Sequence, residues 1–497
     1  MSIPVRVTGL GCASASNRLE HRIPTPFLEC FSGEGVSFCG NGNVASSMGH
    51  DIMKMTRFLV VVLALFPGLA SARPTVQQAY AIPPMDAPTL AALGAYEIGT
   101  RRIEIASPGS VTLTAKGVSR ATRMIKTRIW YPARVSTRAV RTRFSHILPR
   151  PDGKGLAFAI PSLAVEGGVV LAGQRYPLVI VSHGYNGWDT FMTWLTENLA
   201  TKGYFVVAID HGDQRAAGGP ELAVSFGNVL INRAADQRAV IDHFTTLAAN
   251  SKDQLGNAID AEHIGVVGFS MGGFGALATA GMDYDPASSV FSQLPAEARA
   301  AIFASQQNGR AIAARVKAVV TLAPFGGRPD SRVWTGATVA KFAKPVLLID
   351  GSEDDIVDVK QGVTWIFDQM ARNDRHFLLF QNARHNVGGN PAPPEADSDF
   401  STREYFAEPV WRTERINAIN QHFITAFFDL NLKGDQAKSA YLNVAPVVAG
   451  DGQWPLKPLE NVGGRPASDQ EPGFWRGFQR RWALGLEMRS GGADKAR

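Results

Sequence analysis

Short apolar runs alternate with helical patterns through residues 176–430. The runs are almost continuously apolar, as expected for strands buried on both faces, and the segments between them show the apolar spacing of helices. Alternation of this kind is typical of a mostly parallel sheet. The predicted strands span 178–181, 204–209, 264–267, 316–322, 345–349 and 376–380, and the predicted helices span 190–202, 228–249 and 411–430. We therefore predict the α/β class, with a mostly parallel central sheet flanked by helices.

The regions around this alternation carry weaker patterns. Two strands, 96–105 and 123–131, are predicted before it, and glycine and proline clusters predict a loop-rich segment over 134–175. Residues 376–380 form the last strand that the pattern predicts. The expected parts of the chain are an extended arm at 73–95, one domain at 96–430 that contains a helical insertion or lid at 281–315, and a C-terminal arm packed on the body at 431–497.

The C-terminal arm is rich in aromatic residues that stand among arginines. These are Trp454, Phe474, Trp475, Phe478 and Trp482. Such a mixture is also found in segments that lie on a membrane surface. Packing on the body is the favoured interpretation, and a membrane-surface element is the alternative.

Residues 53–72 have the pattern of a secretory signal peptide. Lys54 and Arg57 precede an apolar stretch that is too short to span a bilayer, and Ala70-Ser71-Ala72 is a small-residue cleavage site. We expect cleavage after Ala72, a periplasmic or secreted protein, and no stable membrane insertion. Residues 1–52 are then expected to be a disordered, non-native upstream extension.

Composition narrows the chemistry of the exported part. All three cysteines lie before Met53, so the remaining chain has no disulfide, cysteine nucleophile or cysteine-bound metal. Residues 101–150 hold twelve Lys and Arg residues against one acidic residue. These cations alternate with apolar residues at strand spacing, which favours a solvated face of edge strands over a nucleic-acid surface. No nucleic-acid partner is expected.

The strand at 264–267 leads into Gly268-Phe269-Ser270-Met271-Gly272, and a helical pattern of small residues follows. A serine at the apex of a tight strand-to-helix turn exposes its hydroxyl, and the two glycines allow the strand and the helix to approach closely. The backbone N–H of Met271 then lies at a helix N-terminus, where negative charge is stabilised. This pattern predicts that Ser270 is a nucleophile.

Three further polar segments follow predicted strands, so they should share the carboxyl edge of the sheet with Ser270. Ser182-His183-Gly184-Tyr185 would place the N–H of Tyr185 beside that of Met271 as an oxyanion hole. The segment 351–357 offers Asp354, followed at the usual spacing by apolar residues, with Asp355 as the alternative acid. His385, directly after the last predicted strand, is the expected general base.

Together, the order Ser270, Asp354, His385 resembles that of the α/β-hydrolase superfamily over roughly residues 96–430. The strand end at 130–133 (Trp-Tyr-Pro-Ala), with the Ser-His-Gly-Tyr and Gly-Phe-Ser-Met-Gly motifs, resembles the platelet-activating-factor acetylhydrolase and predicted dienelactone hydrolase branch. Cutinase-like polyester hydrolases are more distant in this comparison. Ser270 replaces the cysteine nucleophile of true dienelactone hydrolases, and the insertion and tail exceed what compact cutinase-like enzymes contain.

The resemblance implies an exported serine esterase that needs no metal or organic cofactor and acts on a small-molecule ester. Amidase, peptidase or lactonase activity with the same triad is the enzymatic alternative, and a non-catalytic binding protein on the same fold is the alternative from another class. Aromatic residues placed by topology near the site are candidates for a substrate pocket. They are Tyr185, Trp188, Phe269 and Phe325.

Overall fold

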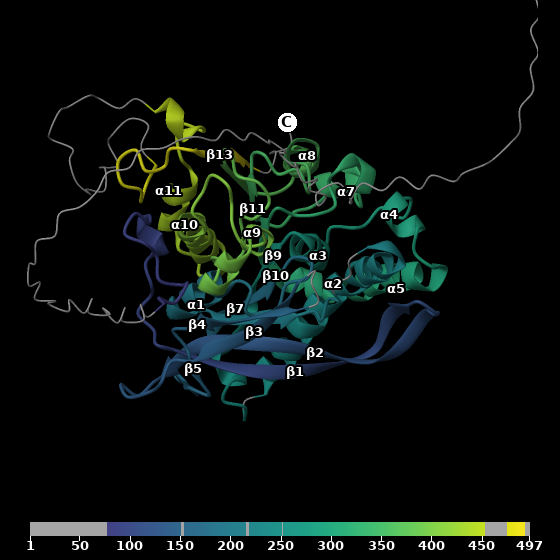
Figure 1. The fold of residues 1–497 in the computed structure, drawn as a ribbon, viewed down its shortest axis with the longest axis horizontal. Helices are drawn as coiled ribbons and strands as arrows, with labels where there is room; N and C mark the ends of the chain where they lie inside the picture. The colour runs from purple at the N-terminus through teal and green to yellow at the C-terminus, as the bar shows by residue number, and fades with distance from the viewer. Residues whose placement is uncertain (1–76, 151–153, 215–217, 251, 453–474, 493–497) are drawn as a thin grey trace, which may run out of the picture. The chain divides into compact units, whose positions relative to one another are not determined.

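A computed structural model describes residues 77–150, 154–214, 218–250, 252–452 and 475–492 (Figure 1). Its centre is a parallel sheet in the order β12-β11-β10-β9-β7-β8. These strands are β7 (Tyr176–Ser182), β8 (Phe205–Asp210), β9 (Ile259–Phe269), β10 (Val316–Leu322), β11 (Val346–Gly351) and β12 (Arg375–Phe380). Almost every residue in them is buried, as their apolar runs predict. The predicted α/β architecture is confirmed.

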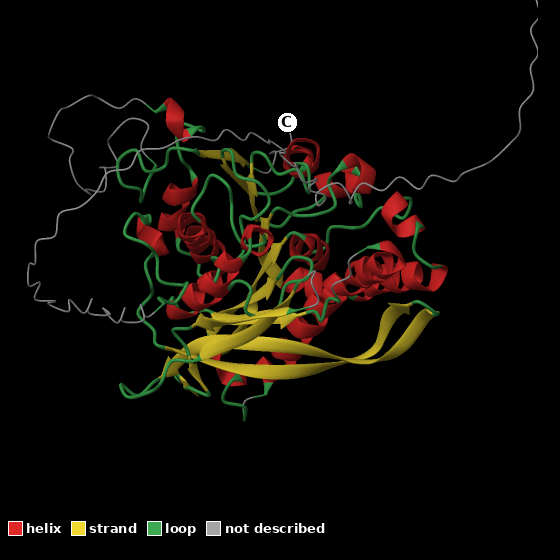
Figure 2. Ribbon diagram, in the orientation of Figure 1, coloured by secondary structure: helices red, strands yellow, loops and turns green. Residues whose placement is uncertain are grey.

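Antiparallel strands extend this sheet at both edges. β2 (Gly117–Arg134) pairs with β8, and β1 (Ile98–Thr114) pairs with β2 in a long hairpin (Figure 2). The short strands β5 (Val165–Glu166) and β6 (Val169–Val170) pair with β1 and β2. At the opposite edge, β13 (Leu486–Gly491) pairs with β12.

Two predictions about strands are wrong. The strand at 376–380 is not the last, because β13 follows it more than a hundred residues later in the chain. The alternation of buried Leu486 and Met488 with more exposed residues in β13 is short, and it lies outside the strand–helix repeat. The supposedly loop-rich segment contains a hairpin of β3 (Arg143–Pro149) and β4 (Gly155–Pro161), which buries apolar side chains on one face.

Helices cover both faces of the central sheet (Figure 1). α1 (Thr193–Thr201) and α10 (Thr413–Leu432) contact each other on one face, and α2 (Gly219–Ala249) and α3 (Met271–Thr279) contact each other on the other. The shorter helices are α4 (Ser289–Ser292), α5 (Ala296–Asn308), α6 (Arg310–Arg315), α7 (Gly336–Ala340), α8 (Thr364–Gln369), α9 (Phe400–Glu404) and α11 (Ser439–Leu442). The segment 281–315 contains α4 to α6, and α5 packs against α2 and β1.

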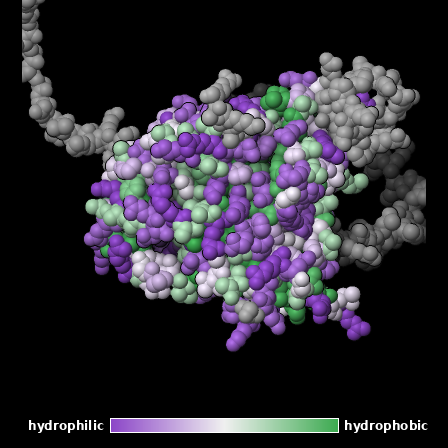
Figure 3. Space-filling view, turned by 180° about the vertical axis from the view of Figure 1, so that it is seen from behind, coloured by the Kyte–Doolittle hydropathy of each residue, from purple (hydrophilic) through white to green (hydrophobic). Residues whose placement is uncertain are grey.

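The basic segment is not solvated along its whole length. Arg128 is 7% exposed and pairs with Glu166 and with buried Asp189, while Arg123 pairs with buried Asp236. The expected solvated face is therefore wrong for these two arginines, because each pairs with a carboxylate that lies inside the domain, Asp189 or Asp236. Elsewhere, hydrophilic side chains cover much of the face seen in Figure 3.

Part of the C-terminal arm is described. Trp475 and Phe478 are fully buried and pack against Phe423 of α10, whereas Trp482 is half exposed. The leader at 53–72, the segment 1–52, Trp454 and Phe474 lie outside the described residues. No helix within the described ranges has the length and apolar character needed to cross a membrane.

Candidate active site

Ser270 occupies a strained turn between β9 and α3. Its φ of 52° and ψ of −114° lie where a non-glycine residue is unfavourable, so the surrounding structure must hold it there. A Cβ at Gly268 would lie 2.1 Å from the carbonyl oxygen of Gly272, and a Cβ at Gly272 would lie 2.1 Å from that of Ser182. Both glycines are therefore required by close backbone contacts, as the motif predicts.

His385 joins the serine to a carboxylate. Its Nε2 lies 3.0 Å from Ser270 Oγ, and its Nδ1 lies 2.6 Å from Asp354 Oδ2. A carboxylate can only accept, so Nδ1 carries a proton toward Asp354 and Nε2 can accept the proton of the serine hydroxyl. The structure thus brings the three predicted residues together in hydrogen-bonding order.

The sequence left Asp355 as an alternative acid, and the structure places it elsewhere. Its carboxylate is exposed and forms a two-pronged ion pair with Arg384, at 2.9 and 3.0 Å. Asp354, by contrast, is fully buried, and its Oδ1 accepts from the backbone N–H groups of Ile356 and Val357. Asp354 is therefore the carboxylate that is fixed against His385.

A second buried carboxyl group, Asp350, lies behind Asp354 at the end of β11. Burial raises the pKa of Asp354, but the charge and hydrogen bond of His385, together with backbone donors, outweigh it and lower the pKa to about 2. Burial and the negative charge of Asp354 raise the pKa of Asp350 well above its ordinary value. Asp350 is therefore protonated beside an ionised Asp354, because only Asp354 faces the imidazole.

This protonation state predicts how Asp350→Asn changes stability. Above about pH 4 the unfolded chain loses the Asp350 proton while the folded protein keeps it, so wild-type stability from this group falls as pH rises. An amide is neutral at every pH and can still donate to Asp354. The free energy of unfolding, measured in urea, should therefore be higher in the variant than in wild type, and this gain should be larger at pH 8 than at pH 5. A gain of equal size at both pH values would show that Asp350 is ionised.

Glu408 is a residue of the site that the sequence did not reveal. Its buried carboxylate accepts from the backbone N–H of Arg384 at 2.7 Å and from that of Asn386 at 2.6 Å, on either side of His385. It lies in the irregular segment between α9 and α10, with no motif around it. One side chain thus fixes the loop that carries the imidazole.

We expect Glu408→Gln to lower kcat about tenfold with little change in KM, because an amide offers one acceptor oxygen for two N–H donors. The matched control is Glu404→Gln, since Glu404 is half exposed and reaches Arg384 only at 4.0 Å. Steady-state kinetics on a chromogenic ester measure both variants. Equal activity of the two would show that this contact does not position His385.

The segment after β7 reaches the serine as expected. A Cβ at Gly184 would lie 3.3 Å from the Cβ of Ser270, so the backbone just before Tyr185 passes directly beside the nucleophile. Met271 is the first residue of α3, and its N–H belongs to the free N-terminal turn. The backbone at Gly184 and the first turn of α3 therefore both lie next to Ser270, and the oxyanion hole of Tyr185 and Met271 stays a prediction.

The four candidate pocket residues take different positions. The centre of the Phe269 ring lies 5.2 Å from the centre of the His385 ring. The backbone N–H of Phe325 donates to the carbonyl of Ser270. Trp188 stacks on His146 of β3 and also contacts Phe191, which in turn stacks on Phe269. The Tyr185 ring packs edge-to-face against Phe226, and Phe226 packs in the same way against Phe325.

Phe226, on the first turns of α2, was not predicted. It is partly exposed and completes an aromatic group with Tyr185 and Phe325 beside Ser270. Phe226 lies more than forty residues before Ser270 in the chain, so only the folded arrangement reveals it. Within the described ranges, no group of three or more His, Cys, Asp or Glu residues is arranged to hold a metal ion.

The chain has the α/β-hydrolase fold. This follows from the order of the strands in the sheet, the strained turn at the serine, and the placement of Ser270, Asp354 and His385. A family model described as PET hydrolase-like matches residues 170–290. This match covers β7, β8, β9 and the serine turn, and ends before Asp354 and His385.

The relatives are cutinases. Cutinase est1 of Thermobifida alba is 31% identical over 216 residues, which are 43% of this chain and 54% of that protein. Cutinase est2 of the same organism is 33% identical over 107 residues, covering 21% of this chain and 30% of that protein. The chain thus spans about half the length of the first of these relatives. The resemblance to the acetylhydrolase and dienelactone hydrolase branch stays a prediction.

Among solved structures, a ferulic acid esterase from Streptomyces cinnamoneus is 21% identical, with a TM-score of 0.44. The match covers 70% of this chain and 94% of that one.

Proposed function

We propose that this protein is a serine hydrolase that cleaves carboxylic esters through an acyl-enzyme intermediate. The observation that carries the proposal is the position of the His385 ring, with Nε2 at 3.0 Å from Ser270 Oγ and Nδ1 at 2.6 Å from Asp354. Similarity to cutinases supports an ester as the substrate. The strained Ser270 turn supports a functional serine, because such strain concentrates at active sites.

In this mechanism His385 takes the proton of Ser270 as the hydroxyl attacks the acyl carbonyl. The N–H groups of Tyr185 and Met271 stabilise the oxyanion of the tetrahedral intermediate. The imidazolium, stabilised by ionised Asp354, then protonates the leaving alcohol. Water releases the acyl group from Ser270 through the same states in reverse, and His385 again carries the proton.

The substrate that fits this site is an ester with a small or medium apolar or aromatic group. Tyr185, Phe226 and Phe325 would receive that group beside the serine. We also propose that the protein is exported, on the pattern of residues 53–72.

Parallel assays distinguish the candidate functions. We expect wild-type protein to hydrolyse p-nitrophenyl acetate at least about a hundredfold faster, in kcat/KM, than the matching p-nitroanilide, because an alcohol leaves more readily than an amine. A higher rate on the anilide would favour an amidase, and a higher rate on a γ-lactone would favour a lactonase. Absence of turnover on all three classes would support the non-catalytic alternative. A panel of p-nitrophenyl esters with graded acyl length then sizes the pocket.

A further inference from the structure

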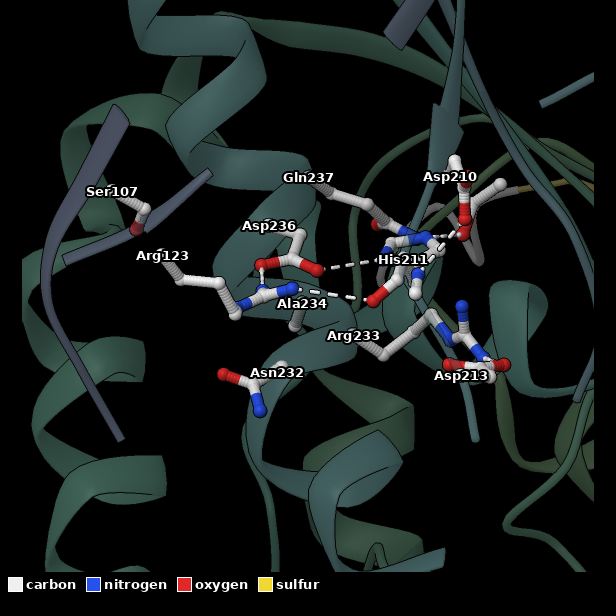
Figure 4. A network of polar contacts seen from close by, with 12 residues as sticks. Ser107, Arg123, Asp210, His211, Asp213, Asn232, Arg233, Ala234, Asp236 and Gln237 are labelled. Atoms are coloured by element: carbon white, nitrogen blue, oxygen red, sulfur yellow. Dashed lines mark hydrogen bonds and ion pairs between the residues drawn. The ribbon is translucent and has the colours of Figure 1, made fainter. Parts of the chain in front are cut away.

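A buried polar cluster lies beside the active site, centred on His211 at the end of β8 (Figure 4). The His211 ring lies 2.8 Å from Ser182 Oγ on one side and 2.8 Å from Asp236 of α2 on the other. Arg123 of β2 pairs with the same Asp236 and donates to the carbonyl of His211. Ser182, His211 and Asp236 thus repeat the order of hydrogen bonds seen at Ser270, in a place closed to solvent.

The direction of each hydrogen bond follows from the groups present. The carboxylate of Asp236 can only accept, so His211 donates from Nδ1 and accepts the Ser182 hydroxyl proton at Nε2. Burial and the charge of Arg233 lower the pKa of His211 well below its ordinary range, which keeps the ring neutral. Because Ser182 is fully buried, this arrangement cannot serve a substrate. It can fix the segment in which Ser182 lies.

That segment, Ser182 to Gly187, carries Tyr185, and further contacts hold it. The backbone N–H of His211 donates to His183 Nε2 at 3.3 Å, so the neutral His183 ring carries its proton on Nδ1, which lies 2.6 Å from the Gly184 carbonyl. The N–H of Asn186 donates to Asp213 at 3.0 Å. Contacts therefore hold the backbone on both sides of Tyr185.

Side chains from one turn of α2, on its buried face, bind the residues that make these contacts. Arg233 is fully buried and pairs with Asp213 at 2.6 Å, and Asp236 holds His211. Gln237 acts on the side of the oxyanion hole that Met271 would form, since its Nε2 donates to the Gly272 carbonyl in the first turn of α3. Positions three and four apart share a helix face, so Arg233, Asp236 and Gln237 act from one side of α2.

We propose that this turn of α2, through His211 and Asp213 on one side and Gln237 on the other, sets the spacing of the two oxyanion donors. The inference rests on the proposed function, because it assigns a role to residues behind the Ser270 site. Arg233, Asp236, His211 and Ser182 are positioning residues and touch no substrate. Loss of one oxyanion donor costs about 10²- to 10³-fold in kcat in enzymes of this kind, so a displaced donor should cost part of that factor.

The test is Ser182→Ala, which removes one hydroxyl from the cluster. We expect kcat on p-nitrophenyl acetate to fall about tenfold or more, with KM changed less than twofold. Hydrogen–deuterium exchange of the peptide 182–187 should become faster. Ser182→Thr, which keeps the hydroxyl, should restore both values toward wild type.

The matched control is Ser490→Ala. Ser490 Oγ also lies 2.8 Å from a histidine ring, that of His376, but this pair is at the amino end of β12, away from the carboxyl edge that carries Ser270. The control should leave kcat and the exchange of 182–187 unchanged. Gln237→Leu tests the other half of the hole and should accelerate exchange at the start of α3 and lower kcat.

Faster exchange with wild-type kcat in Ser182→Ala would overturn the proposal, because the loop would move without consequence for the reaction. Unchanged exchange would overturn it as well. If Ser182→Ala does not fold, an unaltered kcat in Gln237→Leu would overturn the proposal instead. If wild-type protein cleaves no ester, the proposed function fails, and the exchange data still decide whether the cluster holds the loop.

Discussion

Replacing His385 by alanine is expected to lower kcat on p-nitrophenyl acetate by roughly 10⁵- to 10⁶-fold. Without the imidazole, no group accepts the proton of Ser270 or returns it to the leaving alcohol. His385 lies in a loop held by Glu408 through its backbone neighbours, so the variant should fold normally. Circular dichroism and thermal unfolding should confirm this.

The control for this variant is His263→Ala. His263 is half exposed and bonds to Asp260 at the surface, so its loss should leave kcat within about twofold of wild type. A folded His385→Ala protein with more than about a tenth of wild-type kcat would show that another group is the base. His183, whose ring is buried between Gly184 and His211, would then need testing in the same way.

Asp354→Asn should lower kcat by about 10⁴-fold, while Asp355→Asn should leave it within about threefold. The amide introduced by the first substitution can donate to His385 Nδ1 and would favour the tautomer with its proton on Nε2, which cannot accept from Ser270. Asp355 only pairs with Arg384 at the surface. The two substitutions change the same atoms at adjacent positions, so composition and net charge are matched.

Equal losses in both variants would indicate a general electrostatic effect of this loop, and a larger loss in Asp355→Asn would reverse the assignment. The pH at which each variant is assayed must stay above the Asp354 pKa of about 2, where the wild-type carboxylate is ionised. Assays at pH 7 to 8 satisfy this condition.

The sequence predicts those features that local patterns encode. Continuous apolar runs place the six parallel strands within a few residues, and the spacing Gly268-x-Ser270-x-Gly272 places the serine turn. Ser270, Asp354 and His385 each follow a strand of a parallel sheet, so topology alone brings them to one edge. The choice between adjacent Asp354 and Asp355 needed the direction of each side chain.

Residues whose roles depend on distant partners could not be predicted. Glu408 acts on backbone groups about twenty residues away and stands in an irregular segment. Asp236 and Gln237 look like ordinary polar positions of a long helix, yet their partners lie just after β8 and on α3. Arg123 is only partly exposed, and its partner Asp236 lies inside the domain. Such pairs carry no periodic signal in the chain.

The central claim is that Ser270 is an activated nucleophile, and covalent labelling tests it most directly. Folded protein is treated with a fluorophosphonate, digested, and analysed by mass spectrometry, with Ser270→Ala as the matched sample. We predict one stoichiometric adduct on the peptide that contains Ser270, and none in the variant. An unlabelled wild-type protein, or an adduct on another serine that persists in Ser270→Ala, would contradict this claim.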